Sequence, residues 1–271
     1  MQVAIIGTGL IGGSLGLALR ARGHRVVVWD ADPGRLAAAR DAGVADEVAD
    51  SAASVVLGCD VTVVAVPVAH VAGLVVDAIA AGAPVVTDVG SVKAPIIAEV
   101  ATCGAPASRY VGGHPMAGSE QDGLAGADPD LFVGATWVLT PVPGTDADAH
   151  ATVRALASAV GAEVVEVDPA EHDALVAVVS HVPQLAATTL MDVAADAGEG
   201  SALLLRLAAG GFRDMTRIAA SHPAIWPDIC AANRDAIVEA LDRYVAALGD
   251  VRRMVDDGER GALLELLERA R

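Results

Sequence analysis

Gly7-Thr8-Gly9-Leu10-Ile11-Gly12 has the spacing G-x-G-x-x-G and lies between two segments of different hydrophobic pattern. The β-branched run 2–7 is typical of a strand buried on both faces of a parallel sheet. Residues 10–22 predict a helix, which ends at Gly23. A second β-branched run, 25–29, predicts the next strand. Because a strand, a glycine-rich turn, a helix and a strand follow in this order, the segment predicts a βαβ unit.

The three glycines of this turn have separate physical tasks in a dinucleotide site. Gly7 permits the tight turn, Gly9 lets a pyrophosphate approach the backbone, and Gly12 lets the helix pack closely on the strand. The free N–H groups at the start of the helix then face the phosphates. The expected cofactor contacts are therefore Gly7, Thr8, Gly9, Leu10, Ile11 and Gly12, with Val66, Pro67 and Ser91 from later in the chain.

Asp30 indicates which dinucleotide binds. It ends the second predicted strand, 18 residues after Gly12. A carboxylate there accepts the ribose hydroxyls of NAD and repels the 2′-phosphate of NADP, and no arginine follows before Arg35. The sequence therefore predicts NAD. The alternative, a glycine-rich turn that merely packs tightly, leaves this acidic residue unexplained.

Strands and helices alternate over the first part of the chain and then give way to helices alone. Strands are expected at 61–66, 84–88, 110–113, 137–141 and 164–167, helices at 33–42, 71–81 and 92–100, and a loose loop at 140–149. Residues 1–167 therefore predict a doubly wound parallel α/β sheet of the Rossmann type. Residues 168–271 predict an all-α domain, with helices at 171–195, 203–209, 223–248 and 263–269 and a kink at Pro183.

The all-α domain has an apolar helix face that needs a covering surface. Ile237, Leu241, Tyr244, Val245 and Leu248 share one side of the predicted helix 223–248. This face could pack on the first domain or on a second copy of the chain. We favour the second copy and expect a homodimer built on this domain.

Composition excludes several classes of partner. The 271 residues carry 18 basic and 35 acidic side chains, a net charge of −17, so nucleic-acid and anionic-membrane partners are not expected. Cys59, Cys103 and Cys230 form no C-x-x-C pair, which is typical of reduced thiols in a cytoplasmic protein. Glycines interrupt the apolar amino terminus, so no export signal is expected, and we expect no membrane span elsewhere.

Two polar segments follow predicted strand ends, where ligands of doubly wound sheets bind. The first is Gly90-Ser91-Val92-Lys93, which holds the only lysine of the chain. Its alternative is an exposed lysine at a helix start. The second contains His114, between two glycines and a proline, with a pKa suited to a proton acceptor. Its alternative is a histidine satisfied within a loop. No His or Cys lies near it at metal-ligand spacing, so no metal is expected.

Two further polar clusters lie in the all-α domain. Ser180-His181-Val182-Pro183 interrupts an apolar helix, and buried polar groups need partners. Residues 210–217 form a glycine-broken turn that contains Arg213, Asp214 and Arg217. In so acidic a chain this turn is the candidate clamp for a substrate carboxylate, because arginine binds carboxylates in a bidentate way. The alternative is an ion network between the domains.

Taken together, these motifs resemble the prephenate/arogenate dehydrogenase family of tyrosine biosynthesis. They are G-x-G-L-I-G-G-S-L at 7–15, G-S-x-K at 90–93, G-G-H-P-M-A-G at 112–118, S-H-x-P at 180–183 and G-F-R-D-x-T-R at 211–217. The resemblance implies a small-molecule substrate in a cleft between a Rossmann domain and a helical dimerisation domain. The reaction it implies is NAD-dependent oxidative decarboxylation of prephenate to 4-hydroxyphenylpyruvate.

The resemblance also implies roles for individual residues. His114 would take the proton of the ring hydroxyl as hydride leaves for the nicotinamide, and Ser91 would hydrogen-bond to that hydroxyl. Arg217 would hold a substrate carboxylate, with His181 and Trp226 near the side chain. The remaining expected substrate contacts are Lys93, Ser119, Glu120, Arg213 and Asp214.

Four other functions stay open on the sequence. Arogenate or amino-deoxyprephenate could replace prephenate as substrate, because they differ from it by an amine. A hydroxyacid dehydrogenase would use Lys93 as its catalytic residue and leave His114 dispensable. An NAD-sensing regulator would need neither a general base nor a carboxylate clamp.

Overall fold

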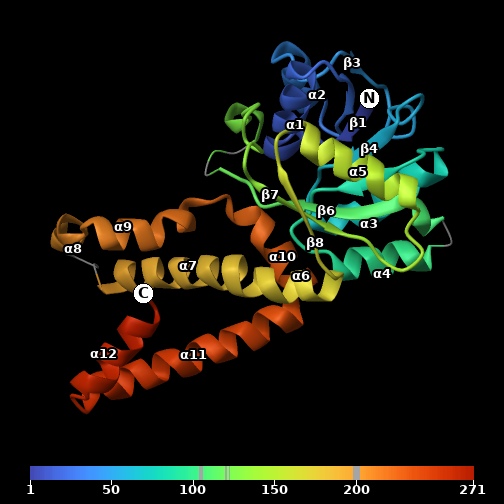
Figure 1. The fold of residues 1–271 in the computed structure, drawn as a ribbon. Coiled ribbons are helices and arrows are strands. Elements are labelled where there is room, and N and C mark those ends of the chain that lie inside the picture. The colour runs from blue at the N-terminus through green and yellow to red at the C-terminus, as the bar shows by residue number, and fades with distance from the viewer. Residues whose placement is uncertain (104–105, 120, 122, 198–201) are drawn as a thin grey trace.

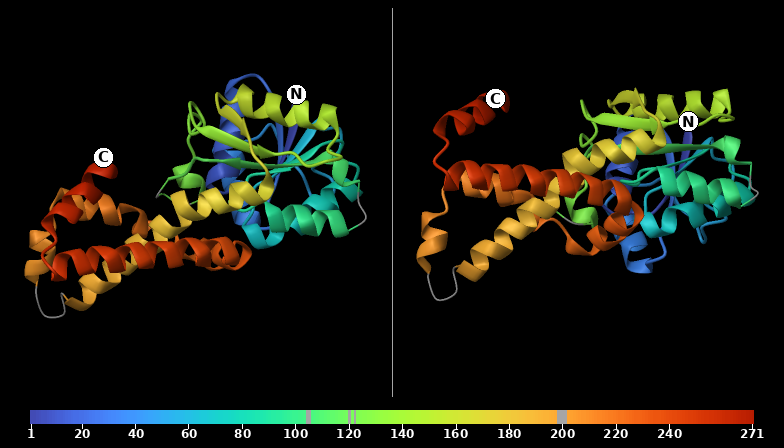
Figure 2. Two further views of the ribbon diagram at one scale, coloured as in Figure 1. Left: turned by 60° about the horizontal axis from the view of Figure 1, so that its bottom comes forward. Right: turned by 90° about the horizontal axis from the view of Figure 1, so that it is seen from below.

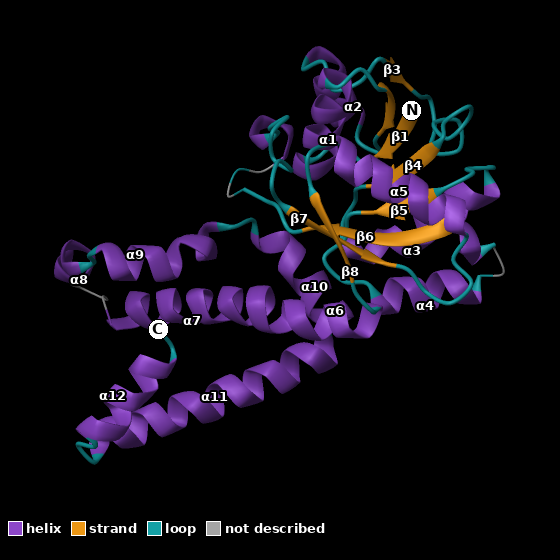
Figure 3. Ribbon diagram, in the orientation of Figure 1, coloured by secondary structure: helices purple, strands orange, loops and turns teal. Residues whose placement is uncertain are grey.

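The computed structural model describes residues 1–103, 106–119, 121, 123–197 and 202–271. Figure 1 shows two parts: an α/β part that contains all the labelled strands, and a helical part that extends away from it. In Figure 3 the strands gather in the first part, and the second consists of helices joined by short loops. The last described strand ends at Glu166, and helices follow from Pro169 onward.

The α/β part is built on one eight-stranded sheet with the order β3-β2-β1-β4-β5-β6-β7-β8. The strands are β1 (Gln2–Ile6), β2 (Arg25–Trp29), β3 (Glu47–Val48), β4 (Val61–Val64), β5 (Val86–Asp88), β6 (Tyr110–Pro115), β7 (Thr136–Thr140) and β8 (Glu163–Glu166). All neighbouring strands are parallel except β6 and β7, which are antiparallel. The doubly wound sheet is confirmed, with this one antiparallel pair as an addition.

Helices cover both faces of the sheet, because successive strand residues point to opposite sides. Val3 and Ile5 of β1 pack with α1 (Leu10–Ala21), α2 (Pro33–Asp41) and α5 (Ala147–Ala159). Ala4 and Ile6 pack with α3 (Val68–Ala80) and α4 (Ala94–Thr102) on the other face. Both cores consist mainly of Val, Leu, Ile and Ala, as the scarcity of aromatic residues requires.

Three local expectations for this part need correction. The short strand β3 was not expected, because two residues show no period. The loose loop expected at 140–149 gives way at Ala147 to helix α5, which Asp146 caps by accepting hydrogen bonds from the backbone of Asp148 and Ala149. The strand expected at 110–113 runs on to Pro115, because His114 and Pro115 pair with β7. His114 therefore lies in a strand and not in a loop.

The helical part begins with one long helix that runs through three segments. They are α6 (Pro169–Val176), a π-helical segment (Ala177–His181) and α7 (Val182–Ala197). Pro183 has no N–H to donate to the carbonyl one turn earlier, and a π-helical segment lies directly before the turn where a kink was expected. Residues 169–197 of this helix are long and apolar enough, by length and composition alone, to cross a membrane, at a mean hydropathy of 1.5, but the core helix of a soluble protein passes the same test.

The remaining helices return toward the sheet and then leave it. They are α8 (Ala202–Leu207), α9 (Gly210–Thr216), α10 (Trp226–Ala232), α11 (Arg234–Asp256) and α12 (Arg260–Arg269), with short 3-10 segments at Arg217–Ala220 and Pro223–Ile225. The turn expected at 210–217 is thus mostly helical. The helix expected over 223–248 is divided in two at Asn233.

The two parts meet where α10 packs on α3 and α6 packs on α4. The views in Figure 2 show α7 and α11 continuing away from this junction, so that their outer halves lie far from the sheet. The core of the helical part is small and centres on Ala177, Val182, Ile237 and Ala240. Of the polar residues expected to act on a substrate, Trp226 begins α10 at this junction, whereas Arg213 and Asp214 lie on α9, which packs on α7 and which Figure 1 shows away from the sheet.

Candidate active site

The glycine-rich turn has the geometry expected for a phosphate-binding loop. Gly7 has a φ of 100°, and a Cβ there would lie 2.3 Å from the Ala65 carbonyl oxygen. A Cβ on Gly12 would lie 2.0 Å from the Gly7 oxygen, so helix and strand approach as closely as glycine allows. At Gly9 no atom lies within 4 Å of the Cβ position. The space beside Gly9, at the amino end of α1, therefore fits the pyrophosphate of a dinucleotide.

Asp30 lies against this turn. One of its carboxylate oxygens accepts hydrogen bonds from the Thr8 backbone N–H at 2.7 Å and the Thr8 hydroxyl at 2.9 Å. The other oxygen accepts from the Asp32 N–H at 2.9 Å. The side chain of Val66 is next to Gly7, and Pro67 is exposed where the chain leaves β4. These residues thus surround the carboxyl ends of β1, β2 and β4, where the sequence places the cofactor.

A buried carboxylate, Asp88, joins the polar segment after β5 to strand β6. It accepts hydrogen bonds from the Gly90 N–H at 2.8 Å, the Tyr110 hydroxyl at 2.7 Å and the Gly113 N–H at 3.1 Å. It also forms an ion pair with Lys93, and both side chains are 0% exposed. Asp88 therefore fixes the Ser91 loop relative to the strand that carries His114.

Lys93 is neither a surface lysine nor an open substrate contact in this structure. Its ammonium binds the Asp88 carboxylate and donates a hydrogen bond to the Gly113 carbonyl at 2.7 Å. Burial lowers the pKa of Lys93, and Asp88 opposes that shift. We therefore assign its charge to the folded core and not to the substrate.

The two glycines before His114 are required by close packing. A Cβ on Gly112 would lie 2.5 Å from the Thr140 hydroxyl, and one on Gly113 would lie 2.7 Å from the Asp88 carbonyl oxygen. His114 follows them near the end of β6 with 9% of its surface exposed. Ser91 is half-buried in the neighbouring loop.

Sequence reasoning missed two residues that contact His114 directly or indirectly. The Nδ1 atom of His114 lies 2.9 Å from Nε2 of His172, and Nδ1 of His172 lies 2.8 Å from an Asp173 carboxylate oxygen. The same carboxylate accepts hydrogen bonds from the backbone N–H groups of Lys93 and Ala94, each at 2.8 Å. A helix of the second domain thereby caps α4 of the first and supports its histidine.

The polar cluster at His181 is also brought together with expected partners. The His181 and Trp226 rings meet edge to face, with centroids 6.1 Å apart. Asn233, which sequence reasoning also missed, lies 3.2 Å from Nδ1 of His181 and donates a hydrogen bond to the Asp173 carbonyl at 2.8 Å. These contacts connect His181 to the same short stretch of α6 that supports His114.

The remaining candidates lie at the surface of the helical part or on the loop after β6. Arg213, Asp214 and Arg217 are exposed, and the 3-10 segment that contains Arg217 packs on α7. Ser119 is exposed, and its hydroxyl accepts a hydrogen bond from the Gln121 N–H at 3.1 Å. Glu120 lies outside the described residues.

The electrostatics keep His114 and His181 neutral at pH 7. Burial lowers the pKa of His114 well below its usual value, and Lys93, His172 and His181 lower it further. Burial likewise lowers the pKa of His181 to about 4, although Asp173 opposes this shift. A neutral imidazole at position 114 is the form that accepts a proton.

The His181 shift predicts how stability changes with pH. In the unfolded chain this group has a pKa of 6.5, so between pH 6.5 and about 4 the unfolded state binds the proton more strongly. We expect urea-unfolding stability to fall as pH decreases through this window. His181→Gln should flatten that slope relative to the unchanged protein. An identical slope in both proteins would contradict the assignment.

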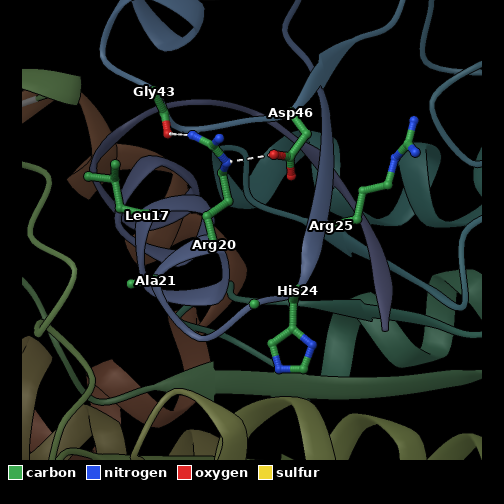
Figure 4. Close-up of a pocket in the computed structure, with 8 residues that line it drawn as sticks. Leu17, Arg20, Ala21, His24, Arg25, Gly43 and Asp46 are labelled. Atoms are coloured by element: carbon green, nitrogen blue, oxygen red, sulfur yellow. Dashed lines mark hydrogen bonds and ion pairs between the residues drawn. The ribbon is translucent and has the colours of Figure 1, made fainter.

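A cavity of about 810 Å³ lies elsewhere in the α/β part, at the carboxyl end of α1 and the start of β2. Figure 4 shows the Arg20 guanidinium between Gly43 and Asp46. Arg25 on the same rim pairs with Glu47. This cavity is at the opposite end of α1 from the glycine-rich turn, and we do not assign it to the cofactor. Among the residues that the structure describes, no group of three His, Cys, Asp or Glu could hold a metal ion.

Comparison with known proteins identifies the family. Residues 15–166 match the family model of the prephenate dehydrogenase nucleotide-binding domain, and residues 168–269 match its dimerization domain. A prephenate dehydrogenase of Bacillus subtilis is 34% identical over 274 residues, with 99% of this chain and 74% of the relative covered.

Two solved structures share the fold over nearly the whole chain. Prephenate dehydrogenase from A. aeolicus, in complex with hydroxyphenyl propionate and NAD+, is 30% identical with a TM-score of 0.91, and covers 100% of this chain and 96% of that one. Synechocystis arogenate dehydrogenase is 28% identical with a TM-score of 0.82. The match covers 99% of this chain and 97% of that one. With both domains matched in order, the chain belongs to the prephenate dehydrogenase family.

Proposed function

We propose that the chain is a prephenate dehydrogenase, which oxidatively decarboxylates prephenate to 4-hydroxyphenylpyruvate with NAD. The observation that carries this proposal is the neutral, mostly buried His114 at the end of β6, on the sheet edge where the glycine-rich turn also lies. Family membership supports the chemistry, and a buried, neutral imidazole near the carboxyl end of β6 is suited to serve as its base.

The proposed cofactor residues are those of the glycine-rich turn with Asp30, Val66, Pro67 and Ser91. The fit rests on the open space at Gly9 and on a carboxylate at the end of β2. NAD, when bound, supplies the hydride acceptor. The chain itself holds the dinucleotide and excludes a 2′-phosphate through the charge of Asp30.

The proton chemistry of the reaction needs a base that returns its proton. His114 accepts the proton of the ring C4 hydroxyl as that carbon is oxidised. The electron pair of the bond to the departing carbon dioxide then completes an aromatic ring, and the C4 oxygen regains a proton. Prephenate and NAD thus give 4-hydroxyphenylpyruvate, carbon dioxide and NADH without net release of a proton. Such general-base catalysis is worth about 10²- to 10⁴-fold in rate.

The proposed substrate site combines residues of both domains. Ser91 orients the ring hydroxyl beside His114, and Arg217 binds a substrate carboxylate. His181 and Trp226, whose rings are in contact, face the substrate side chain. Arg213, Asp214 and Ser119 shape the mouth of the site. A hydroxyacid dehydrogenase with a catalytic lysine is disfavoured, because Lys93 is buried in an ion pair with Asp88.

Arg217→Ala tests the carboxylate clamp. A charged bidentate contact is worth about 1.5–3 kcal/mol, so we expect KM for prephenate to rise tenfold or more while the Kd of NAD stays unchanged. Arg154→Ala, which removes an exposed arginine paired with Glu166, is the matched control and should leave KM unchanged. An unchanged KM in Arg217→Ala would move the clamp elsewhere, with Arg213 as the next candidate.

One assay separates the candidate functions. NADH formation is measured with prephenate and with arogenate, and the prephenate reaction is repeated with NADP. We expect the highest kcat/KM with prephenate and NAD. The structural likeness to an arogenate dehydrogenase makes arogenate the second candidate, and a preference for it would reassign the substrate. Equal or better use of NADP would contradict the role of Asp30, and NAD binding without turnover would favour a regulator.

We also propose that residues 1–167 and 168–271 form the two domains and that the second builds a homodimer in the cytoplasm. The large exposed hydrophobic side chains lie mostly in the helical part, with Val245 at 64% and Leu248 at 48% exposure on the expected α11 face. Three cysteines without a disulfide are in keeping with a reducing compartment. A monomeric mass by light scattering at micromolar protein would contradict the dimer.

A further inference from the structure

We propose that His172 and Asp173 are positioning residues that hold His114 in the tautomer with its proton on Nδ1, which leaves the Nε2 lone pair for the substrate. The inference rests on the proposed function, because it explains how His114 serves as a base. It assigns a role to two residues that none of the sequence motifs contained.

The Asp173 carboxylate can only accept hydrogen bonds. Its Oδ1 accepts from the Lys93 N–H at 2.8 Å, and its Oδ2 accepts from the Ala94 N–H at 2.8 Å. These two donors are the first free N–H groups of α4, so the carboxylate is anchored at a helix amino terminus. A histidine nitrogen 2.8 Å from Oδ1 must therefore carry a proton, and that nitrogen is Nδ1 of His172.

Because Nδ1 of His172 carries a proton, Nε2 of the same neutral ring carries a lone pair. In the neutral ring Nε2 is then an acceptor, and it lies 2.9 Å from Nδ1 of His114. A hydrogen bond across this distance requires His114 to donate from Nδ1. The opposite tautomer of His114 would place two lone pairs against each other in a buried site, because His172 is 2% exposed.

Nε2 of His114 is therefore the proton acceptor of the neutral ring. The described residues place no hydrogen-bond partner on this atom, and the side chain has its 9% exposure near the end of β6. The chain Asp173–His172–His114 thus turns the basic nitrogen outward. The order of groups corresponds to the way a buried aspartate orients the histidine of a serine-protease triad, with one more imidazole between them.

The surroundings of His114 favour its neutral form and therefore favour release of a proton that it has accepted. The groups that face this imidazole are Lys93 from the loop before α4, His172 from α6 and His181 from the π-helical segment, and all three oppose a positive charge. Lys93 is neutralised by Asp88. Asp173 is linked to His114 only through His172, so we expect His114 to hold the proton briefly and to return it to the C4 oxygen.

The first test observes the tautomer directly in the unchanged enzyme. Long-range ¹H–¹⁵N spectra of protein labelled at histidine nitrogens distinguish protonated from unprotonated ring nitrogens, and the His114 signals are identified by their loss in His114→Asn. We expect Nδ1 of His114 and Nδ1 of His172 to be protonated at pH 7.5. A proton on Nε2 of His114 would overturn the inference, whether or not the enzyme acts on prephenate.

The second test asks whether His172 acts through His114. His172→Leu removes the acceptor, and we expect kcat to fall about 10²-fold with KM and the Kd of NAD within about twofold. His172→Gln places an amide oxygen where Nε2 was, and it should recover at least about tenfold of that loss. His150→Leu replaces a histidine on α5 that pairs with Glu166, and it should leave kcat within about twofold.

The outcomes separate this inference from the proposed function. An active unchanged enzyme whose His172→Leu variant keeps its kcat would overturn the positioning role. A wild-type enzyme that forms no NADH with either substrate would overturn the proposed function, and the nitrogen spectrum would still decide the tautomer. If His172→Leu does not fold, the nitrogen spectrum and the kcat of His172→Gln test the positioning role instead. A changed His114 tautomer in His172→Gln without a loss of kcat would contradict that role.

Discussion

The His114→Asn enzyme is expected to turn over about 10²- to 10⁴-fold more slowly than the unchanged enzyme while binding NAD with the same affinity. Asparagine keeps an N–H donor near the position of Nδ1, so the contact with His172 can persist. It lacks the Nε2 lone pair that accepts the proton from the substrate. The loss therefore falls on kcat, measured as NADH formation at saturating prephenate.

Two further measurements make this result specific. The Kd of NAD, from fluorescence titration, should be unchanged. The glycine-rich turn follows β1, and β4 and β5 lie between β1 and the strand β6 that carries His114. His150→Asn, on the outer helix α5, should retain full activity. A kcat of His114→Asn within twofold of the unchanged enzyme would remove His114 from the chemistry.

The second large effect is on stability. Lys93→Met should lower the free energy of unfolding by about 3–5 kcal/mol, because it leaves the Asp88 carboxylate buried without its counter-charge. The loss is measured by urea unfolding at pH 7.5. Since Asp88 also holds Gly113 and the Ser91 loop, we expect activity to fall along with stability.

The matched control is an ion pair of the same kind at the surface. Arg25 and Glu47 lie 2.8 Å apart, but both side chains are more than half exposed. Arg25→Met should therefore cost at most about 1 kcal/mol. If Lys93→Met costs no more than this control, the buried pair contributes nothing to the fold.

The βαβ unit beside the proposed cofactor site could be anticipated because its signals are local. A β-branched run, three glycines and an acidic residue follow one another within 30 residues, and each has one structural reason to be there. The change from alternating strands and helices to helices alone could be anticipated from periodicity. The antiparallel β6–β7 pair could not, because the direction of a strand leaves no trace in its own sequence.

The partners of His114 could not be anticipated for a related reason. His172 lies 58 residues further along the chain, on a helix of the other domain, and only tertiary packing brings the two rings together. A usable signal did exist: His172 and Asp173 are adjacent polar residues near the start of a long, mostly apolar helix. Likewise Lys93, placed at the substrate by its position after a strand, is taken into the core by Asp88.

The most direct test of the account is a crystal structure of the enzyme with NAD and 4-hydroxyphenylpyruvate. The account predicts that Nε2 of His114 lies within about 2.6–3.2 Å of the phenol oxygen, which is hydrogen-bond reach. It predicts in the same complex that the Arg217 guanidinium contacts a product carboxylate. A product ring bound out of reach of His114, or a carboxylate held without Arg217, would contradict it.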